Sequence, residues 1–199
     1  MQQYIPALEK SWFELHQHYH FSEPQKLLNK LIAAYSEKQR AYHTIQHLYE
    51  CLILLELVKP YLNDFYAVAL ALWFHDAVYN PQAKDNELKS AELFEQYLTA
   101  DLSDQTLIKI KQWILATQKH ASTDELDLQF LLDIDLAILA ASPARFVEYE
   151  QQIQQARNGN YTPFLDYLQH YQQQHALTPE QVADWLQVAS WAGHDDEVI

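Results

Sequence analysis

A histidine–aspartate pair, His75-Asp76, follows one of the most apolar stretches of the chain. Residues 69–74 read Ala-Leu-Ala-Leu-Trp-Phe directly before the pair, so both side chains are expected to be buried. Removing water from an imidazole or a carboxylate is unfavourable unless the group gains a partner. The pair therefore needs either a mutual hydrogen bond or a shared cation, and a first-row divalent metal ion suits both groups at once.

Two further histidines, His43 and His47, are four residues apart in the chain. Thr44 is a suitable N-cap for a helix, which places His47 in the first turn and His43 directly before it or one turn above it. Either placement lets both imidazoles approach one point. A helix N-terminus also favours bound anions such as phosphate. The spacing by itself is only a weak indication of a metal site.

Two carboxylates, Asp133 and Asp135, lie inside another apolar segment, residues 126–139. Positions two apart on a helix point roughly 200° away from each other, so only one of these carboxylates can face a shared centre. His120 ends the preceding predicted helix. It can be an extra ligand, a substrate contact or a cap on that helix, and the cap is the simplest interpretation.

Helical periodicity predicts the elements that would position these groups. Apolar residues recur at helical spacing over residues 3–20, 22–38, 44–58, 64–79, 85–98, 103–117 and 124–139, and further helix starts occur at Ser142-Pro143, Thr162-Pro163 and Thr178-Pro179. The chain has only two glycines, which leaves little material for hairpin turns. We therefore predict an all-α helical bundle that forms a single domain over residues 1–199, with C-terminal helices over residues 143–193.

The composition limits the partners of the protein. The 27 acidic residues exceed the 13 basic ones, for a net charge of −14, and such a surface repels a nucleic-acid polymer, although a local cation can still bind a small phosphate. Cys51 is the only cysteine, which fits a reducing compartment. No secretion signal precedes the first helix, and no apolar run approaches the ~20 residues of a membrane helix. We expect a cytoplasmic protein without a membrane partner, and a homo-oligomer remains open.

Four short blocks of sequence, taken together and in their order along the chain, identify a protein family more specifically than any one of them does. They are Tyr42–His47, Trp73–Tyr79, Asp85–Ala91 and Leu132–Leu136. Together they resemble the HD-domain superfamily, in particular its stand-alone group of predicted metal-dependent phosphohydrolases, over roughly residues 30–140. The resemblance implies an HD-type helical bundle whose metal ligands fall on His47, His75, Asp76 and Asp135. Asp135 is preferred to Asp133 because its Asp-Leu step matches the last ligand of the superfamily.

The resemblance also implies an activity, the hydrolysis of a small phosphorylated substrate such as a nucleotide. The metal ion (Mn, Mg, Zn, Ni, Co or Fe) would lower the pKa of a bound water and polarise a phosphoryl oxygen. Asp85 or Glu87 would orient or deprotonate that water. The substrate would be held by charged and polar side chains near the metal, namely Arg40, His43, Asn86, Lys89 and His120.

Two other functions remain open at this point. One is a non-catalytic helical protein of the same fold that binds a metal or a small molecule. It is favoured by the Gln-rich residues 150–156, which have only Arg145 and Arg157 nearby, and it predicts stabilisation by a ligand without turnover. The other is oxidation by two irons, which would require His120 and Asp133 to join the ligand set.

Overall fold

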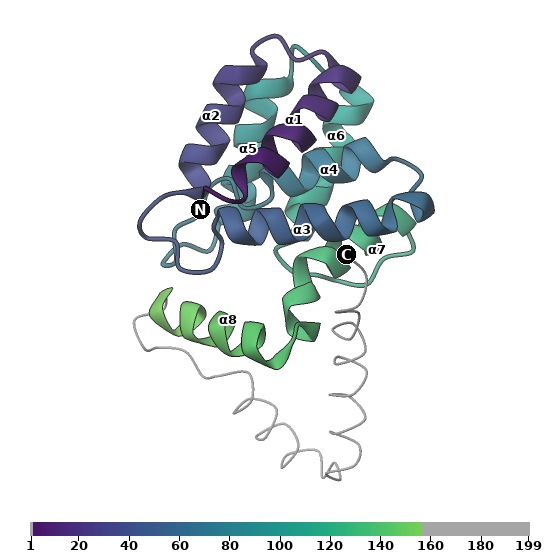
Figure 1. Ribbon diagram of the computed structural model, residues 1–199. Helices are drawn as coiled ribbons and strands as arrows, with labels where there is room; N and C mark the ends of the chain where they lie inside the picture. The colour runs from purple at the N-terminus through teal and green to yellow at the C-terminus, as the bar shows by residue number, and fades with distance from the viewer. Residues whose placement is uncertain (1, 157–199) are drawn as a thin grey trace. The chain divides into compact units, whose positions relative to one another are not determined.

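The computed structural model describes residues 2–156, which belong to two compact units, the first ending at Asp135 and the second beginning at Leu136 (Figure 1). Every regular element of the described residues is helical, which confirms the predicted all-α fold. The prediction of a single domain over residues 1–199 stays a prediction. The helices predicted to start near residues 162 and 178 lie outside the described residues.

Seven α-helices and one short 3-10 helix build the first unit. They are α1 (Ile5–Tyr19), α2 (Pro24–Tyr35), α3 (Ile45–Val58), η1 (Lys59–Tyr61), α4 (Phe65–Phe74), α5 (Asn86–Leu98), α6 (Asp104–Ala116) and α7 (Leu126–Asp135). The second unit begins with the 3-10 helix η2 (Leu136–Ala140) and α8 (Pro143–Ala156). No helix among the residues described here is both long and apolar enough to cross a lipid bilayer.

Helix α4 is the centre of the first unit. Every residue from Ala67 to Phe74 is buried, and the helix packs against α1, α3, α5, α6 and α7. An α-helix that is apolar on all sides is stable in water only when other elements cover it, so the sequence of α4 explains its central place. Helices α3, α4 and α7 lie side by side (Figure 1), and these three carry the predicted metal ligands.

Two carboxylates fix the start of α4. Asp64 is the N-cap and accepts a hydrogen bond from the amide of Ala67 at 3.1 Å. Asp127, a buried residue of α7, accepts the amides of Asn63 and Asp64, each at 2.8 Å. The first amides of a helix have no partner inside the helix, and their partial positive charge favours a carboxylate. Asp127 therefore joins the first turn of α7 to the start of α4.

We expect Asp127→Ala to lower the free energy of unfolding by about 1–2 kcal/mol, because it leaves two partly buried amides without a charged acceptor. Denaturant unfolding followed by circular dichroism measures the change. Asp133→Ala is the matched control, since Asp133 lies on the same helix but is exposed, and its effect should stay within about 0.5 kcal/mol. Equal stabilities of the two variants would contradict this role of Asp127.

The start of α2 has no side-chain cap. Ser22 precedes this helix and is a suitable capping residue, but the N-cap is Glu23. Ser22 instead donates to Asp101 through its amide and its hydroxyl, at 3.0 and 3.2 Å. The proline at the first position of α2 has no amide hydrogen, so one of the bonds that a cap would supply is not needed there.

Candidate metal centre

The ends of three helices bring the four predicted ligands together. His47 lies in the first turn of α3, whose start is fixed by Thr44, a side chain that accepts the amide of Gln46 at 3.3 Å. His75 directly follows α4, and its amide still donates to the carbonyl of Ala71 at 2.8 Å. Asp135 is the last residue of α7. One donor atom from each of His47, His75, Asp76 and Asp135 lies within 4.8 Å of all the others.

The distances between these donor atoms match a shared cation. His47 Nε2 and His75 Nε2 are 3.2 Å apart, and each lies 3.2 Å from Oδ1 of Asp135. Oδ2 of Asp76 lies 3.2 Å from His75 Nε2 and 3.5 Å from His47 Nε2. Ligand atoms about 2.1 Å from one ion lie about 3.0 Å apart at right angles and about 3.4 Å apart in a tetrahedron. These five separations therefore agree with those that a single divalent ion requires.

The orientation of His75 is fixed by the backbone. Its Nδ1–H donates to the carbonyl of Leu72 at 2.8 Å. A neutral imidazole that donates through Nδ1 keeps a lone pair on Nε2, the nitrogen that faces the other three groups. Metal-binding histidines are commonly held in this way by a carbonyl or carboxylate.

One oxygen of the cluster lacks a hydrogen-bond donor. Oδ2 of Asp76 is buried and has no hydrogen-bond partner among the described residues, although the imidazoles of His47 and His75 lie within ion-pair distance. A buried carboxylate oxygen without a donor is unfavourable. A cation between the four side chains would satisfy it, so these residues fit a divalent metal ion.

The pKa values of the cluster reflect the same need for positive charge. Burial lowers the pKa of His75, but the carboxylates of Asp76 and Asp135 outweigh it and hold the pKa well above its usual range. Burial likewise opposes protonation of His47, while contacts with Cys51 and Asp135 raise its pKa to about 10. Burial raises the pKa of Asp76 and of Asp135. The nearby imidazoles, His75 above all, outweigh burial and hold both pKa values below their usual range. Protons on the imidazoles or a bound cation can each neutralise the two carboxylates.

Two partly exposed histidines stand at the edge of the cluster. His43 Nε2 lies 3.9 Å from Asp76 Oδ2, and the His43 side chain is 25% exposed. His120 Nε2 lies 2.9 Å from Asp135 Oδ2, and its side chain is 23% exposed. Burial lowers the pKa of His43 to about 4, so this imidazole is neutral near pH 7. Both rings can contact a ligand that approaches the four central side chains.

The other predicted contacts lie elsewhere or serve the fold. The side chain of Asn86 is buried and bonds the backbone of Asn80 at 2.9 and 3.0 Å, which closes the turn before α5. Lys89 is exposed and pairs with Asp85 at 3.0 Å. Glu87 lies in the first turn of α5, and neither Glu87 nor Asp85 belongs to the cluster.

Arg40 was also predicted to bind a substrate. Its side chain has no exposed surface, and its guanidinium donates to three backbone carbonyls. The donors of Arg40 are therefore engaged within the protein.

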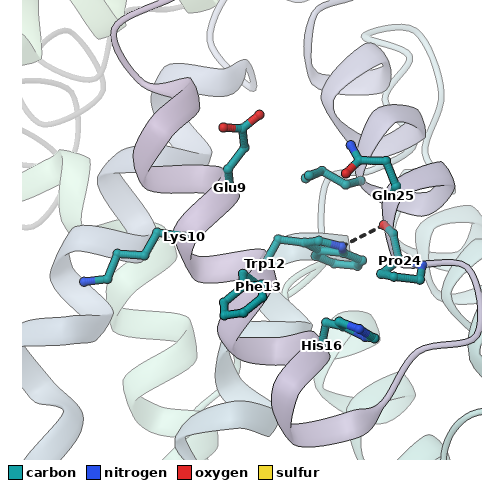
Figure 2. A pocket seen from close by; sticks show the side chains of 8 residues that line it. Glu9, Lys10, Trp12, Phe13, His16, Pro24 and Gln25 are labelled. Atoms are coloured by element: carbon teal, nitrogen blue, oxygen red, sulfur yellow. Dashed lines mark hydrogen bonds between the residues drawn. The ribbon is translucent and has the colours of Figure 1, made fainter.

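A groove between α1 and α2 was not predicted from the sequence. Figure 2 shows Trp12, Phe13 and His16 of α1 facing Pro24 and Gln25 at the start of α2. The groove has a volume of about 460 Å³, and the indole of Trp12 donates to the carbonyl of Pro24 at 2.9 Å. Phe13 is 60% exposed. The sequence feature that could have indicated this groove is the pair Trp12-Phe13. Two adjacent residues cannot both lie on the buried face of a helix, so one large aromatic side chain must be exposed.

One protein family matches the N-terminal part of the chain. Residues 1–65 match the family described as the N-terminal domain of the cyclic-di-GMP receptor FimW. This match covers about a third of the 199 residues. It includes α1, α2, α3 and η1, and His47 is the one member of the cluster inside it.

Two curated relatives share a short segment with the chain. The poly-beta-1,6-N-acetyl-D-glucosamine export proteins of Escherichia coli K12 and of Escherichia coli O157:H7 are each 45% identical to it over 67 residues. The segment is 32% of this chain and 8% of each relative, so the chain spans a small part of the relatives that it matches. No solved structure gives a significant match.

These matches correct the family and the activity expected from the sequence. The matching family is a cyclic-di-GMP receptor domain and not the HD-domain superfamily, and neither it nor the export proteins are named as hydrolases. The predictions of an enzyme, of a metal-dependent phosphohydrolase and of a small phosphorylated substrate are therefore wrong. The four sequence blocks contain histidines and aspartates that can form a buried cluster. Their presence predicts that cluster, but it does not predict which reaction, if any, the protein catalyses.

Proposed function

We propose that this chain is a non-catalytic receptor in which His47, His75, Asp76 and Asp135 hold one divalent metal ion. The ion binds a phosphate of a cyclic dinucleotide, and His43 and His120 contact the ligand at the edge of the cluster. The observation that carries the proposal is the set of donor-atom separations of 3.2–3.5 Å among four side chains from three helices. A divalent ion held by imidazoles and carboxylates keeps affinity for a further oxygen ligand when its coordination is not complete.

The ligand class is supported by the family that matches residues 1–65, whose description names a cyclic-di-GMP receptor. This segment supplies His43 and His47, one side chain from the edge of the cluster and one from its centre. A metal ion also provides the local positive charge that a phosphodiester needs on a protein with a net charge of −14.

Binding without hydrolysis is supported by the surroundings of the cluster. The carboxylates suggested as general bases, Asp85 and Glu87, are not part of it. Asp85 is instead paired with Lys89. A bound phosphate would thus lie on an ion whose four ligands include neither of these residues.

Calorimetric titration with cyclic-di-GMP tests the proposal, in buffer with Mn²⁺ and in the same buffer with a chelator. We expect binding that requires the metal ion, that is lost in Asp135→Asn and that is kept in the matched control Asp133→Asn, because Asp133 is exposed two residues away. Chromatography of the ligand after the titration should recover it intact.

Three results would contradict the proposal. They are no binding to the metal-loaded protein, conversion of the cyclic dinucleotide to a linear product, and loss of binding in Phe13→Ala together with full binding in Asp135→Asn. The last result would place the ligand in the groove between α1 and α2.

A further inference from the structure

Arg40 is a buried cation outside the regular elements. It lies in the segment between α2 and α3, and its side chain is fully buried. A guanidinium is rarely removed from water unless its donors are all engaged. Arg40 forms an ion pair with Glu37 at 3.2 Å, and the side chain of Glu37 is 44% exposed. A surface ion pair of this kind contributes little, so other contacts must explain the burial of Arg40.

Those contacts are backbone carbonyls next to the metal ligands. Nη1 of Arg40 donates to the carbonyl of Asp76 at 2.8 Å, and Nη2 donates to the carbonyl of Ala77 at 3.1 Å. Nη1 also donates to the carbonyl of His43 at 3.0 Å. The guanidinium thus joins the turn that carries His75 and Asp76 to the segment that leads into His47.

The end of α4 explains why these carbonyls need a donor. The last four carbonyls of a helix and those of the turn beyond it have no partner inside the helix, and their partial negative charge favours a cation. The hydroxyl of Tyr35 donates to the carbonyl of Trp73 at 3.3 Å. Arg40 donates to the carbonyls of Asp76 and Ala77, which follow in the turn beyond α4. The rings of Tyr35 and Tyr79 lie over the guanidinium at 5.2 and 5.4 Å, which limits its orientations further.

We propose that Arg40 is a positioning residue that holds His75 and Asp76 at the correct distance from His47, and thereby sets the metal affinity of the cluster. This inference rests on the proposed metal centre. Arg40 touches neither the four donor atoms nor a ligand, and it acts through the carbonyls of His43, Asp76 and Ala77. A lysine would keep the charge, but its single nitrogen cannot serve two successive carbonyls with the fixed geometry of a guanidinium.

The test compares Arg40→Lys and Arg40→Gln with the wild-type protein. Metal affinity is measured by competition with a chelating dye, and the visible absorption of bound Co²⁺ reports the geometry of the ligands. We expect Co²⁺ affinity to fall about 10- to 100-fold in both variants, as for other residues that orient metal ligands, with a changed Co²⁺ spectrum. Glu37→Gln is the control, since it removes the ion pair and leaves the carbonyls bonded, and its affinity should stay within about twofold of wild type.

The outcomes separate this inference from the proposed function. Failure of the wild-type protein to bind Co²⁺ would overturn the metal centre itself. Wild-type affinity and an unchanged Co²⁺ spectrum in folded Arg40→Lys would overturn the role of Arg40 alone. If Arg40→Gln does not fold, Arg40→Lys decides by itself, and an unfolded lysine variant would assign Arg40 to the stability of the fold and overturn its positioning role.

Discussion

His75→Ala is expected to weaken divalent metal binding by more than about 100-fold, beyond the 10- to 100-fold effect of residues that only orient a ligand. His75 lies at the centre of the cluster, with its Nε2 3.2 Å from His47, Asp76 and Asp135. Its removal also leaves two carboxylates with one imidazole fewer to neutralise them. Competition with a chelating dye measures the affinity, and elemental analysis measures the metal that is retained.

His18→Ala is the matched control for this substitution. His18 is exposed on α1 and stacks on Tyr66 at 4.0 Å, so its loss should leave metal affinity unchanged. His75→Gln is measured as well, since it fills more of the buried space than alanine does. Metal affinity within tenfold of wild type in both His75 variants would show that this side chain is not a ligand.

Removal of the metal ion by a chelator is expected to lower the melting temperature by roughly 5–10 °C. A ligand at 100 times its dissociation constant stabilises the folded state by about 2.7 kcal/mol, and a chain of this size shifts by about 2–4 °C per kcal/mol. The metal ion stabilises the fold because it neutralises Asp76, which is buried, and Asp135, which is partly buried, beside the same two imidazoles. Thermal unfolding with Mn²⁺ and with EDTA measures the shift.

Asp135→Asn serves as the control for chelation, because a protein without the metal centre should melt at one temperature in both buffers. A melting temperature of the wild-type protein that does not respond to Mn²⁺ or EDTA would speak against the metal centre. An equal response of Asp135→Asn would show that the ion acts at another place in the chain.

Local sequence patterns predicted the helices and the residue types of the cluster, and the resemblance to the HD-domain superfamily selected its four members. The apolar run before His75 predicted a buried central helix, and α4 is that helix. Helical geometry required Asp133 and Asp135 to point apart, and Asp133 is exposed while Asp135 faces the two imidazoles. The prediction of the helices depends on backbone periodicity, which is a local property of the chain, whereas the choice of Asp135 over Asp133 came from the resemblance.

Contacts between distant segments could not be predicted in the same way. Arg40 was expected to bind a substrate because it is a cation close in sequence to His43, yet it bonds the carbonyls of Asp76 and Ala77, more than thirty positions away in the sequence. Asp85 and Glu87 were assigned a chemical role from a block of sequence, and that role stays a prediction, since Asp85 pairs with Lys89 and neither residue is among the four proposed ligands. Burial and the destination of a side-chain donor depend on the tertiary fold.

Anomalous diffraction from crystals of the Mn²⁺-loaded protein tests the metal centre most directly. We predict one strong anomalous peak per chain, about 2.0–2.3 Å from a nitrogen or oxygen atom of His47, His75, Asp76 and Asp135. An anomalous peak coordinated only by other residues, or no peak between these four side chains, would contradict the proposed metal centre and the receptor function that depends on it.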